Sequence, residues 1–214
     1  MNLKIAPSIL SANFLNLENE IRKIEKAGAD IIHLDVMDGH FVPNLTFGPE
    51  LVNQIKKITN LPLDVHLMIS NPKFFIPKFI EAGADFISFH IETDSEYEKL
   101  LSEIQQTKIK AGIAINPETD IRSIKKILNF VNFILIMTVH PGFGGQKFIS
   151  ECVHKIRKVC EFRDKKNIEI EVDGGINFQT AKIAKDAGAN ILVAGNFIFK
   201  QKNYSKVIKG LRDV

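Results

Sequence analysis

Histidine and aspartate residues lie in several short apolar segments that are typical of buried β-strands. His33 and Asp35 are two residues apart in the segment Ile31–Val36, so their side chains would point to the same face of a strand. His66 lies in the next such segment, and Asp173 ends a later one. Two imidazoles and two carboxylates suit a borderline divalent cation, with Zn²⁺ as first choice and Fe²⁺, Co²⁺ or Mn²⁺ as alternatives. A cation would also neutralise the two carboxylates, whose burial without a partner is costly.

The same four side chains also fit a hydrogen-bonded polar cluster that holds no metal. Further polar residues, Ser8, His90 and His140, end or directly follow other apolar segments. Chance placement would not give this pattern, because an unpaired polar group inside an apolar strand is costly. His90 and His140 fit either a supporting position beside a metal or a purely structural one.

Three glycine-rich turns follow the last three apolar segments of the chain. They are His140–Gln146, Asp173–Ile176 and Ala194–Asn196, and the first is predicted to open a helix. Glycine lets backbone amides approach a ligand closely, and the N-terminus of a helix favours anions. The turns therefore predict a phosphate site, although tight turns alone would also explain the glycines.

These residues together predict acid/base chemistry on a small phosphorylated molecule that carries a carbonyl or hydroxyl group. Asp35 and Asp173, on different strands, would face opposite sides of one carbon. One would remove a proton and the other would return one from the far side, while a cation holds the developing enediolate charge. Three methionines at strand ends fit either core packing or an apolar wall that excludes water: Met37, Met68 and Met137.

Eight strand-like segments alternate with eight segments of helical periodicity. This alternation is typical of a parallel sheet covered by helices. At about 27 residues per unit, the chain is near the lower limit of a (β/α)₈ TIM barrel, which gathers chemistry at the C-terminal ends of its strands. A doubly wound open sheet is the alternative, but no dinucleotide-type Gly-x-Gly-x-x-Gly follows the first strand. We expect one barrel domain over residues 1–214. The predicted strands are Lys4–Pro7, Ile31–Val36, Leu63–Met68, Phe86–His90, Ala111–Ile115, Phe133–Met137, Glu169–Asp173 and Ile191–Ala194, and the predicted helices are Asn16–Ala27, Pro49–Ile58, Pro72–Ala82, Glu96–Gln106, Ile121–Leu128, Phe148–Arg163, Gln179–Ala187 and Ser205–Leu211.

A recurring phrase marks three of the predicted helix-to-strand connections. It reads Ala27–Asp30, Ala82–Asp85 and Ala187–Asn190, each with glycine in the second position. Glycine takes the left-handed conformation that ends a helix, and Asp or Asn suits the following turn. The phrase therefore predicts a sharp return into the next strand.

Composition narrows the class of protein. The 214 residues include 28 Lys and Arg against 25 Asp and Glu, so no basic surface for nucleic acid is expected. No apolar stretch has the roughly 18 residues of a membrane span, and the first ten residues do not resemble a signal peptide. Cys152 and Cys160 are too far apart on a predicted helix for a disulfide. We expect a cytoplasmic protein, and apolar residues on the outer helices suit a homo-oligomer.

Five segments of the chain are similar to those of the ribulose-phosphate 3-epimerase family. The segment that starts at His33 is the most specific of them, and the resemblance extends over essentially the whole chain. The segments are Ile5–Ala12, His33–Asn44, Asp64–Met68, Met137–Gln146 and Val172–Ile176.

The resemblance implies reversible epimerisation of D-ribulose 5-phosphate and D-xylulose 5-phosphate at carbon 3, through a cis-enediolate. It implies that His33, Asp35, His66 and Asp173 hold one divalent metal ion per subunit, and that Asp35 and Asp173 are the acid/base pair. Met37, Met68 and Met137 would form the wall of the active site. The residues that would bind the ketose phosphate are Ser8, His66, Gly142, Phe143, Gly144, Gly145, Asp173, Gly174, Gly175, Gly195 and Asn196.

Three positions depart from the pattern of the family. Asn196 follows Gly195 where a serine is common, Thr93 follows Glu92, and His140 precedes the proline of the first glycine-rich turn. The change at Asn196 removes a hydroxyl contact to phosphate but keeps the main-chain amide. Two other functions remain open: epimerisation of a six-carbon ketose phosphate such as D-allulose 6-phosphate, and a barrel that binds a phosphosugar without catalysis.

Overall fold

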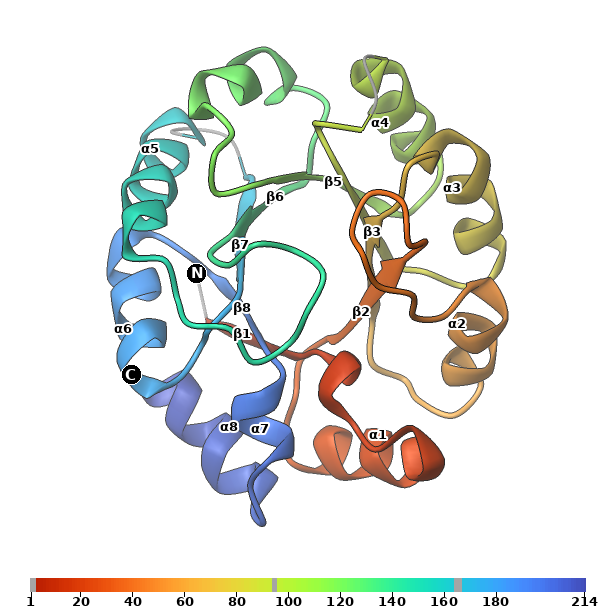
Figure 1. Ribbon diagram of the computed structural model, residues 1–214, viewed down its shortest axis with the longest axis vertical. Coiled ribbons are helices and arrows are strands. Elements are labelled where there is room, and N and C mark those ends of the chain that lie inside the picture. The colour runs from red at the N-terminus through yellow and green to blue at the C-terminus, as the bar shows by residue number, and fades with distance from the viewer. Residues whose placement is uncertain (1–2, 94–95, 164–166) are drawn as a thin grey trace.

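The computed structural model describes residues 3–93, 96–163 and 167–214. Eight parallel strands lie at the centre, in the order β1-β8-β7-β6-β5-β4-β3-β2, and the helices surround them (Figure 1). An isolated parallel bridge between Ser8 and His33 brings the two ends of this sheet together. The strands are β1 Lys4–Pro7, β2 Ile32–Met37, β3 Leu63–Met68, β4 Phe86–His90, β5 Lys110–Ile115, β6 Phe133–Met137, β7 Glu169–Asp173 and β8 Ile191–Ala194.

This arrangement is the (β/α)₈ TIM barrel that the sequence predicts, and the predicted strand bounds agree with the structure to within one residue. Most of the helices also form close to their predicted positions. No helix in the described part of the chain is long and apolar enough to cross a membrane. The α-helices are α1 Leu17–Lys26, α2 Pro49–Lys56, α3 Pro72–Glu81, α4 Tyr97–Gln105, α5 Val153–Arg163, α6 Phe178–Ala187, α7 Asn196–Phe199 and α8 Tyr204–Asp213.

Strand periodicity separates the two faces of the barrel wall. On β2, Ile32, Leu34 and Val36 belong to the large core between the strands and the helices. His33 and Asp35 alternate with them and point into the barrel instead. The same alternation turns the polar residues of β3, β4 and β7 inward.

The floor of the barrel is closed by aromatic rings and by one ion network. Phe86 and Phe133 make an edge-to-face contact with ring centroids 5.6 Å apart. Below them, Glu169 pairs with Lys110 at 2.8 Å and also with Lys4. Charged and aromatic side chains therefore seal the end of the barrel that is remote from the chemistry.

The recurring phrase ends helices as predicted. Gly28, Gly83 and Gly188 have φ angles of 89°, 96° and 114°. These angles lie in the left-handed region, which glycine reaches without the steric cost that a side chain adds.

Two predicted helices differ from the structure. The segment Ile121–Ile127 is a 3-10 helix, because isoleucines three residues apart match its three residues per turn. The helix predicted at Phe148 starts only at Val153, after a 3-10 turn over Ser150–Cys152. The Ile149 amide donates to the Thr138 carbonyl at 2.8 Å and keeps this stretch extended, so the first glycine-rich turn does not open a helix directly.

Helix α7 was not predicted from the sequence. This helix of four residues begins immediately after Gly195, where a plain turn was predicted. Barrels of this class often place a short extra helix after the last strands, beside the phosphate site.

We predict that Gly112→Ala lowers the free energy of unfolding by about 1–3 kcal/mol, the usual cost of overpacking a core. A Cβ atom on Gly112 would lie 2.2 Å from the Phe133 ring, which fills the floor of the barrel. Urea unfolding measures the change. Gly48→Ala is the control, because no atom lies within 4 Å of its added Cβ. Equal losses in the two variants would contradict the packing argument.

Candidate active site

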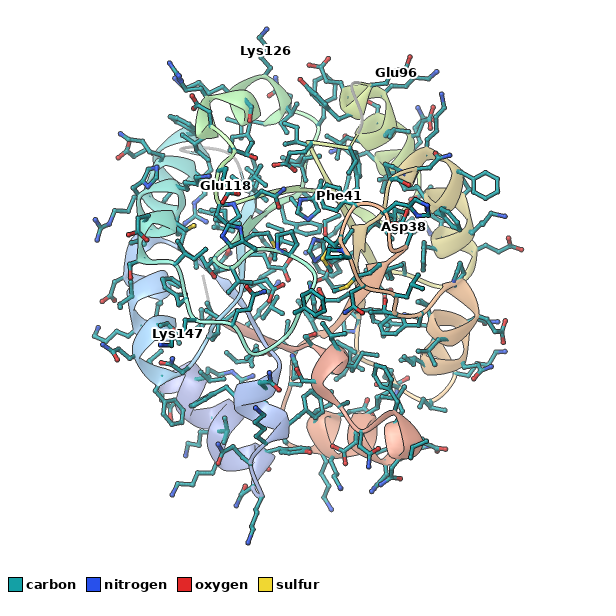
Figure 2. All side chains as sticks on the ribbon, viewed as in Figure 1. Asp38, Phe41, Glu96, Glu118, Lys126 and Lys147 are labelled. Carbon is teal, nitrogen blue, oxygen red and sulfur yellow. The ribbon has the colours of Figure 1, made fainter. Side chains whose placement is uncertain are left out.

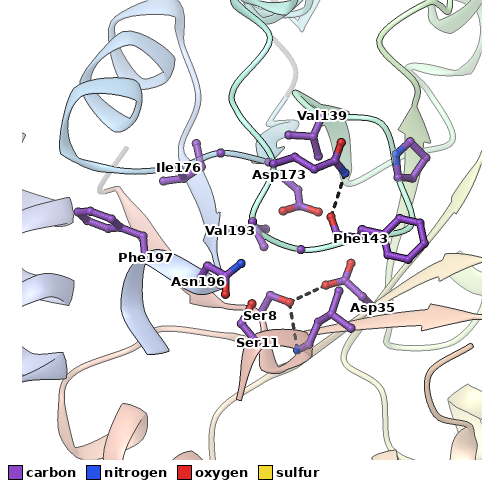
Figure 3. Close-up of a pocket in the computed structure, with 18 of the residues that line it drawn as sticks. Ser8, Ser11, Asp35, Val139, Phe143, Asp173, Ile176, Val193, Asn196 and Phe197 are labelled. Atoms are coloured by element: carbon purple, nitrogen blue, oxygen red, sulfur yellow. Dashed lines mark hydrogen bonds between the residues drawn. The ribbon is translucent and has the colours of Figure 1, made fainter. Parts of the chain in front are cut away.

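A cavity of about 330 Å³ opens at the C-terminal ends of the strands. Its lining includes Ser8 and Asp35 from one side and Asp173 from the other, as Figure 3 shows. The loop between β6 and α5 arches over the centre of the ring in Figure 1. The cavity is therefore where the predicted chemistry would take place.

The four residues that are predicted to bind a metal meet at the base of this cavity, and we call them the ligand group. Each of His33, Asp35, His66 and Asp173 offers one ligand atom, and these atoms all lie within 4.8 Å of one another. The strand register explains the meeting, because Asp35 on β2 lies directly opposite His66 on β3. Nδ1 of His66 is 3.2 Å from Oδ1 of Asp35.

His33 is held so that one ring nitrogen faces this group. Its Nδ1 is 2.6 Å from Oδ2 of Asp64, which fixes the plane of the ring. Its Nε2 is buried and has no hydrogen-bond partner among the described residues, although Oδ1 of Asp35 is 3.3 Å away. A buried imidazole nitrogen without a partner is costly unless a ligand uses it. This orphaned atom, together with the donor set, fits a divalent cation.

The two carboxylates of the group have opposite electrostatic environments. Burial opposes ionisation of Asp35, but the charge of His33 and the nearby ring of His66 hold its pKa far below the usual range. The Ser8 hydroxyl also donates to Oδ2 of Asp35 at 2.5 Å. For Asp173, burial and the charge of Asp35 raise the pKa to about 7. A bound cation would lower both pKa values.

A second layer of carboxyl groups lies beneath His33. Oε1 of Glu171 is 3.4 Å from Nδ1 of His33, and both Asp64 and Glu171 are almost fully buried. Burial and the charge of Asp64 raise the pKa of Glu171 well above its ordinary value. The sequence analysis missed both residues, although each precedes a predicted ligand by two positions and so shares its inward face.

His90 and His140, the other two histidines that end or follow predicted strands, have different surroundings. Nε2 of His90 is 2.9 Å from Nε2 of His66, and both rings are fully buried. His140 is largely exposed and pairs with Glu118 at 3.2 Å. The structure therefore brings His90 to the ligand group and leaves His140 at the rim.

Glycine backbone forms the other half of the cavity. Gly142, Gly145, Gly174 and Gly175 have φ angles of 122°, 81°, 123° and 66°, in the left-handed region. A Cβ on Gly145 would lie only 2.4 Å from Nδ2 of Asn196. The turns after β6 and β8 thus contact each other closely, and a side chain at Gly145 would separate them.

Gly195 is equally confined. A Cβ atom there would lie 2.5 Å from Oγ of Ser11, a cavity residue that the sequence analysis missed. Asn44 was missed as well, and its amide donates to the Gly142 carbonyl at 2.7 Å. No local pattern distinguishes Ser11 or Asn44, because only the closed ring brings them to these glycines.

The three methionines are almost completely buried and line the cavity. Met37, Met68 and Met137 are 4%, 1% and 2% exposed. Phe143 lies at the rim with 55% of its surface exposed. The cavity wall at these positions is therefore apolar and is built from adaptable thioether side chains.

Fold and site together define a (β/α)₈-barrel enzyme with its reactive side chains at the C-terminal mouth. The model of the ribulose-phosphate 3 epimerase family matches residues 4–199. The chain is 48% identical over 213 residues to the ribulose-phosphate 3-epimerase of Bacillus subtilis (strain 168), and the match covers 98% of each protein. It is 47% identical to the chloroplastic ribulose-5-phosphate-3-epimerase of Arabidopsis thaliana, over 97% of this chain and 75% of that protein. The chain belongs to the ribulose-phosphate 3-epimerase family.

Solved structures with more distant sequences share the fold. A 3-hexulose-6-phosphate synthase superposes with a TM-score of 0.71 at 18% identity, and the match covers 100% of this chain and 99% of that one. KGPDC from Streptococcus mutans gives 0.74 at 14% identity, over 100% and 97% of the two chains. At these identities the similarity establishes the barrel alone.

We predict that Zn²⁺ raises the melting temperature of the chelator-treated protein by about 5–10 °C. This is the shift expected when the free Zn²⁺ concentration is one hundred times the Kd, because binding then adds about 2.7 kcal/mol to the free energy of unfolding. His66→Ala should abolish most of the shift, because it removes one of the four ligand atoms. His154→Ala, at an exposed histidine on α5, is the control and should keep the shift. An unchanged shift in His66→Ala would refute the ligand group.

Proposed function

We propose that this protein is a ribulose-phosphate 3-epimerase that interconverts D-ribulose 5-phosphate and D-xylulose 5-phosphate. One observation carries the proposal: two carboxyl groups from β2 and β7, strands separated by β1 and β8, reach into one cavity. Inversion at a carbon requires proton removal on one face and proton return on the other. The curated relatives and the family match support the choice of substrate.

Asp35 and Asp173 are the acid/base pair of the proposed mechanism. Burial would raise the pKa of Asp35, but His33 and His66 hold it low. Asp35 would therefore be ionised and able to take the carbon-3 proton. Asp173, which reaches the same cavity from β7, would return a proton from the other side. In the reverse direction the two residues exchange roles.

The ligand group would hold one divalent cation, through His33, His66 and the two aspartates, and we propose Zn²⁺. When bound, the cation supplies electrostatic stabilisation for the negative charge of the cis-enediolate. Ser8, which donates to Asp35, would keep that carboxylate in place beside the substrate. Met37, Met68 and Met137 would exclude water from the reacting carbon.

The glycine turns would bind the phosphate of the substrate through backbone amides. Their left-handed glycines and their close packing against Asn196 support this assignment. Gly142, Phe143, Gly144 and Gly145 would contribute from the turn after β6. The turns after β7 and β8 would add Gly174, Gly175, Gly195 and Asn196.

We also propose that residues 1–214 act as one catalytic domain, in a cytoplasmic homo-oligomer. The two free cysteines support a reducing compartment. Exposed apolar side chains support assembly, among them Phe14 at 49%, Leu15 at 99% and Phe74 at 56% exposure. Analytical ultracentrifugation at several protein concentrations measures the assembly.

Turnover on two sugars tests the proposed activity. The protein is treated with a strong chelator, reloaded with Zn²⁺, and assayed with D-ribulose 5-phosphate and with D-allulose 6-phosphate. We expect the pentulose phosphate to be the better substrate by kcat/KM, and activity to disappear with the metal and return with it. A clear preference for the hexulose phosphate would favour the six-carbon alternative. Binding without turnover in the loaded protein would favour a non-catalytic barrel.

We predict that Asp173→Asn lowers kcat by about 10²–10⁴-fold, the usual contribution of a positioned acid or base. The zinc content of the variant is measured in parallel, so that lost proton transfer is separated from lost metal. Asp186→Asn, at an exposed ion pair with Lys182 on α6, is the control. Near-normal turnover of zinc-loaded Asp173→Asn would refute the acid/base assignment.

We predict that Gly145→Ala raises KM by about 10–100-fold, because displaced amides lose hydrogen bonds to a charged group worth about 1.5–3 kcal/mol. The added Cβ would meet Asn196, and the φ of 81° would be strained. Gly39→Ala is the matched control, with a φ of 75° outside the cavity lining. A similar KM in the two variants would mean that backbone strain, not the phosphate site, determines the effect.

A further inference from the structure

A buried contact connects His66, one of the proposed metal ligands, to His90, which has no role in the proposed mechanism. Nε2 of His66 and Nε2 of His90 are 2.9 Å apart, and both side chains are fully buried. In a hydrogen bond between two imidazole nitrogens, one nitrogen donates and the other accepts. The direction of this bond determines which nitrogen of His66 keeps a free electron pair.

The position of the ligand group determines whether His66 donates or accepts in its hydrogen bond with His90. Its Nδ1 lies 3.2 Å from Oδ1 of Asp35, on the side where the four ligand atoms meet. A nitrogen that binds a metal must offer an electron pair and therefore carries no hydrogen. The hydrogen of His66 then lies on Nε2, and His66 donates to His90. This step rests on the metal ligands in the proposed function.

Glu92 determines which nitrogen of His90 carries the hydrogen. Its Oε1 accepts the backbone N–H of Asn116 at 3.0 Å and the Thr119 hydroxyl. Its Oε2 is 3.1 Å from Nδ1 of His90. A carboxylate that accepts at both oxygens requires the hydrogen of His90 on Nδ1, which leaves Nε2 free to accept from His66.

The loop that holds Glu92 is itself fixed. The buried ammonium group of Lys155, on α5, donates to the carbonyls of Asn116, Pro117 and Thr119 at 2.9, 2.6 and 2.6 Å. The Phe41 ring covers His90 with a centroid separation of 4.6 Å, and Figure 2 shows Phe41 near the centre of the ring. The chain from His66 to the loop after β5 is therefore continuous and held at both ends.

We propose that His90 and Glu92 are positioning residues that act through His66. Their hydrogen-bond chain keeps the hydrogen of His66 on Nε2 and its Nδ1 electron pair directed at the ligand group. Asp64 orients the ring of His33 in a similar way, through its contact with Nδ1. Outer partners of this kind usually contribute about 10–100-fold to metal affinity.

Glu92→Gln reverses the direction of the hydrogen bonds from Glu92 through His90 to His66, with almost no change in the shape of the side chain. The Asn116 N–H can only donate, so it holds the amide oxygen of the glutamine at the Oε1 position. The amide NH₂ group then faces Nδ1 of His90, which must accept. The hydrogen of His90 moves to Nε2, points at His66, and drives the hydrogen of His66 to Nδ1, where it competes with the metal.

Two substitutions of His90 separate hydrogen bonding from packing. His90→Phe keeps a ring against Phe41 but removes the acceptor for His66. His90→Gln places an amide oxygen near the former Nε2 position and keeps an acceptor. Glu161→Gln, at an exposed pair with Lys158, is the control for the loss of a carboxylate.

The experiment measures Zn²⁺ affinity by competition with a chromophoric chelator, using the full chain. We expect His90→Phe and Glu92→Gln to bind Zn²⁺ about 10–100-fold more weakly than the unmodified protein. His90→Gln should recover most of the affinity, and Glu161→Gln should match the unmodified protein. If His90→Phe does not fold, the Zn²⁺ affinity of Glu92→Gln tests the proposal by itself. Unchanged affinity in Glu92→Gln would overturn the proposal.

Long-range ¹H–¹⁵N NMR on the Zn²⁺-loaded protein, labelled at histidine, reports the tautomer directly. We expect the hydrogen of His90 on Nδ1. A hydrogen on Nε2 of His90, alone or together with one on Nδ1, would overturn the inference while leaving the ligand group intact. Failure of the unmodified protein to bind Zn²⁺ would instead refute the ligand group of the proposed function, and the inference with it.

Discussion

The burial of charged side chains inside an apolar barrel is the constraint on which this structure depends. Two aspartates and two histidines lie close together, and all of them except Asp173 are almost fully buried. Two like charges at this distance cannot both ionise without compensation. The two aspartates accordingly have different surroundings. His33, His66 and Ser8 surround Asp35, whereas burial and the charge of Asp35 raise the pKa of Asp173 to about 7. The resulting difference between two carboxyl groups is what proton transfer at one carbon requires.

Strand periodicity supplies this environment layer by layer. From the floor upward, the barrel interior holds an ion network at Glu169, the rings of Phe86 and Phe133, and then the buried carboxyl groups of Asp64 and Glu171. The ligand group lies above them, and the methionines and glycine turns form the mouth. Asp64 orients His33, and the contact between His66 and His90 connects the ligand group to the loops after β4 and β5.

Much of this could be predicted from the sequence because strand and helix signals alternate regularly. The strand bounds agree closely, and the four residues proposed as metal ligands lie on the inward face of their strands, as predicted from strand alternation. The differences have local causes: isoleucines three residues apart form a 3-10 helix at Ile121–Ile127, and a contact from Ile149 to Thr138 delays α5. Ser11 and Asn44 were missed because barrel closure, not sequence proximity, brings them to the site. Glu171 was missed although strand spacing places it on the same face as Asp173. His90 and His140 looked alike in the sequence, and only their loops separate a buried partner of His66 from an exposed one.

The central claim is that two carboxyl groups transfer protons on opposite faces of one carbon. The most direct measurement follows the early turnover of D-ribulose 5-phosphate in D₂O by NMR. We expect each D-xylulose 5-phosphate molecule formed to carry deuterium at carbon 3, because the second carboxyl group delivers a hydrogen that comes from solvent. Xylulose 5-phosphate that keeps the original hydrogen would contradict the central claim, because one group would then both remove and return the same proton.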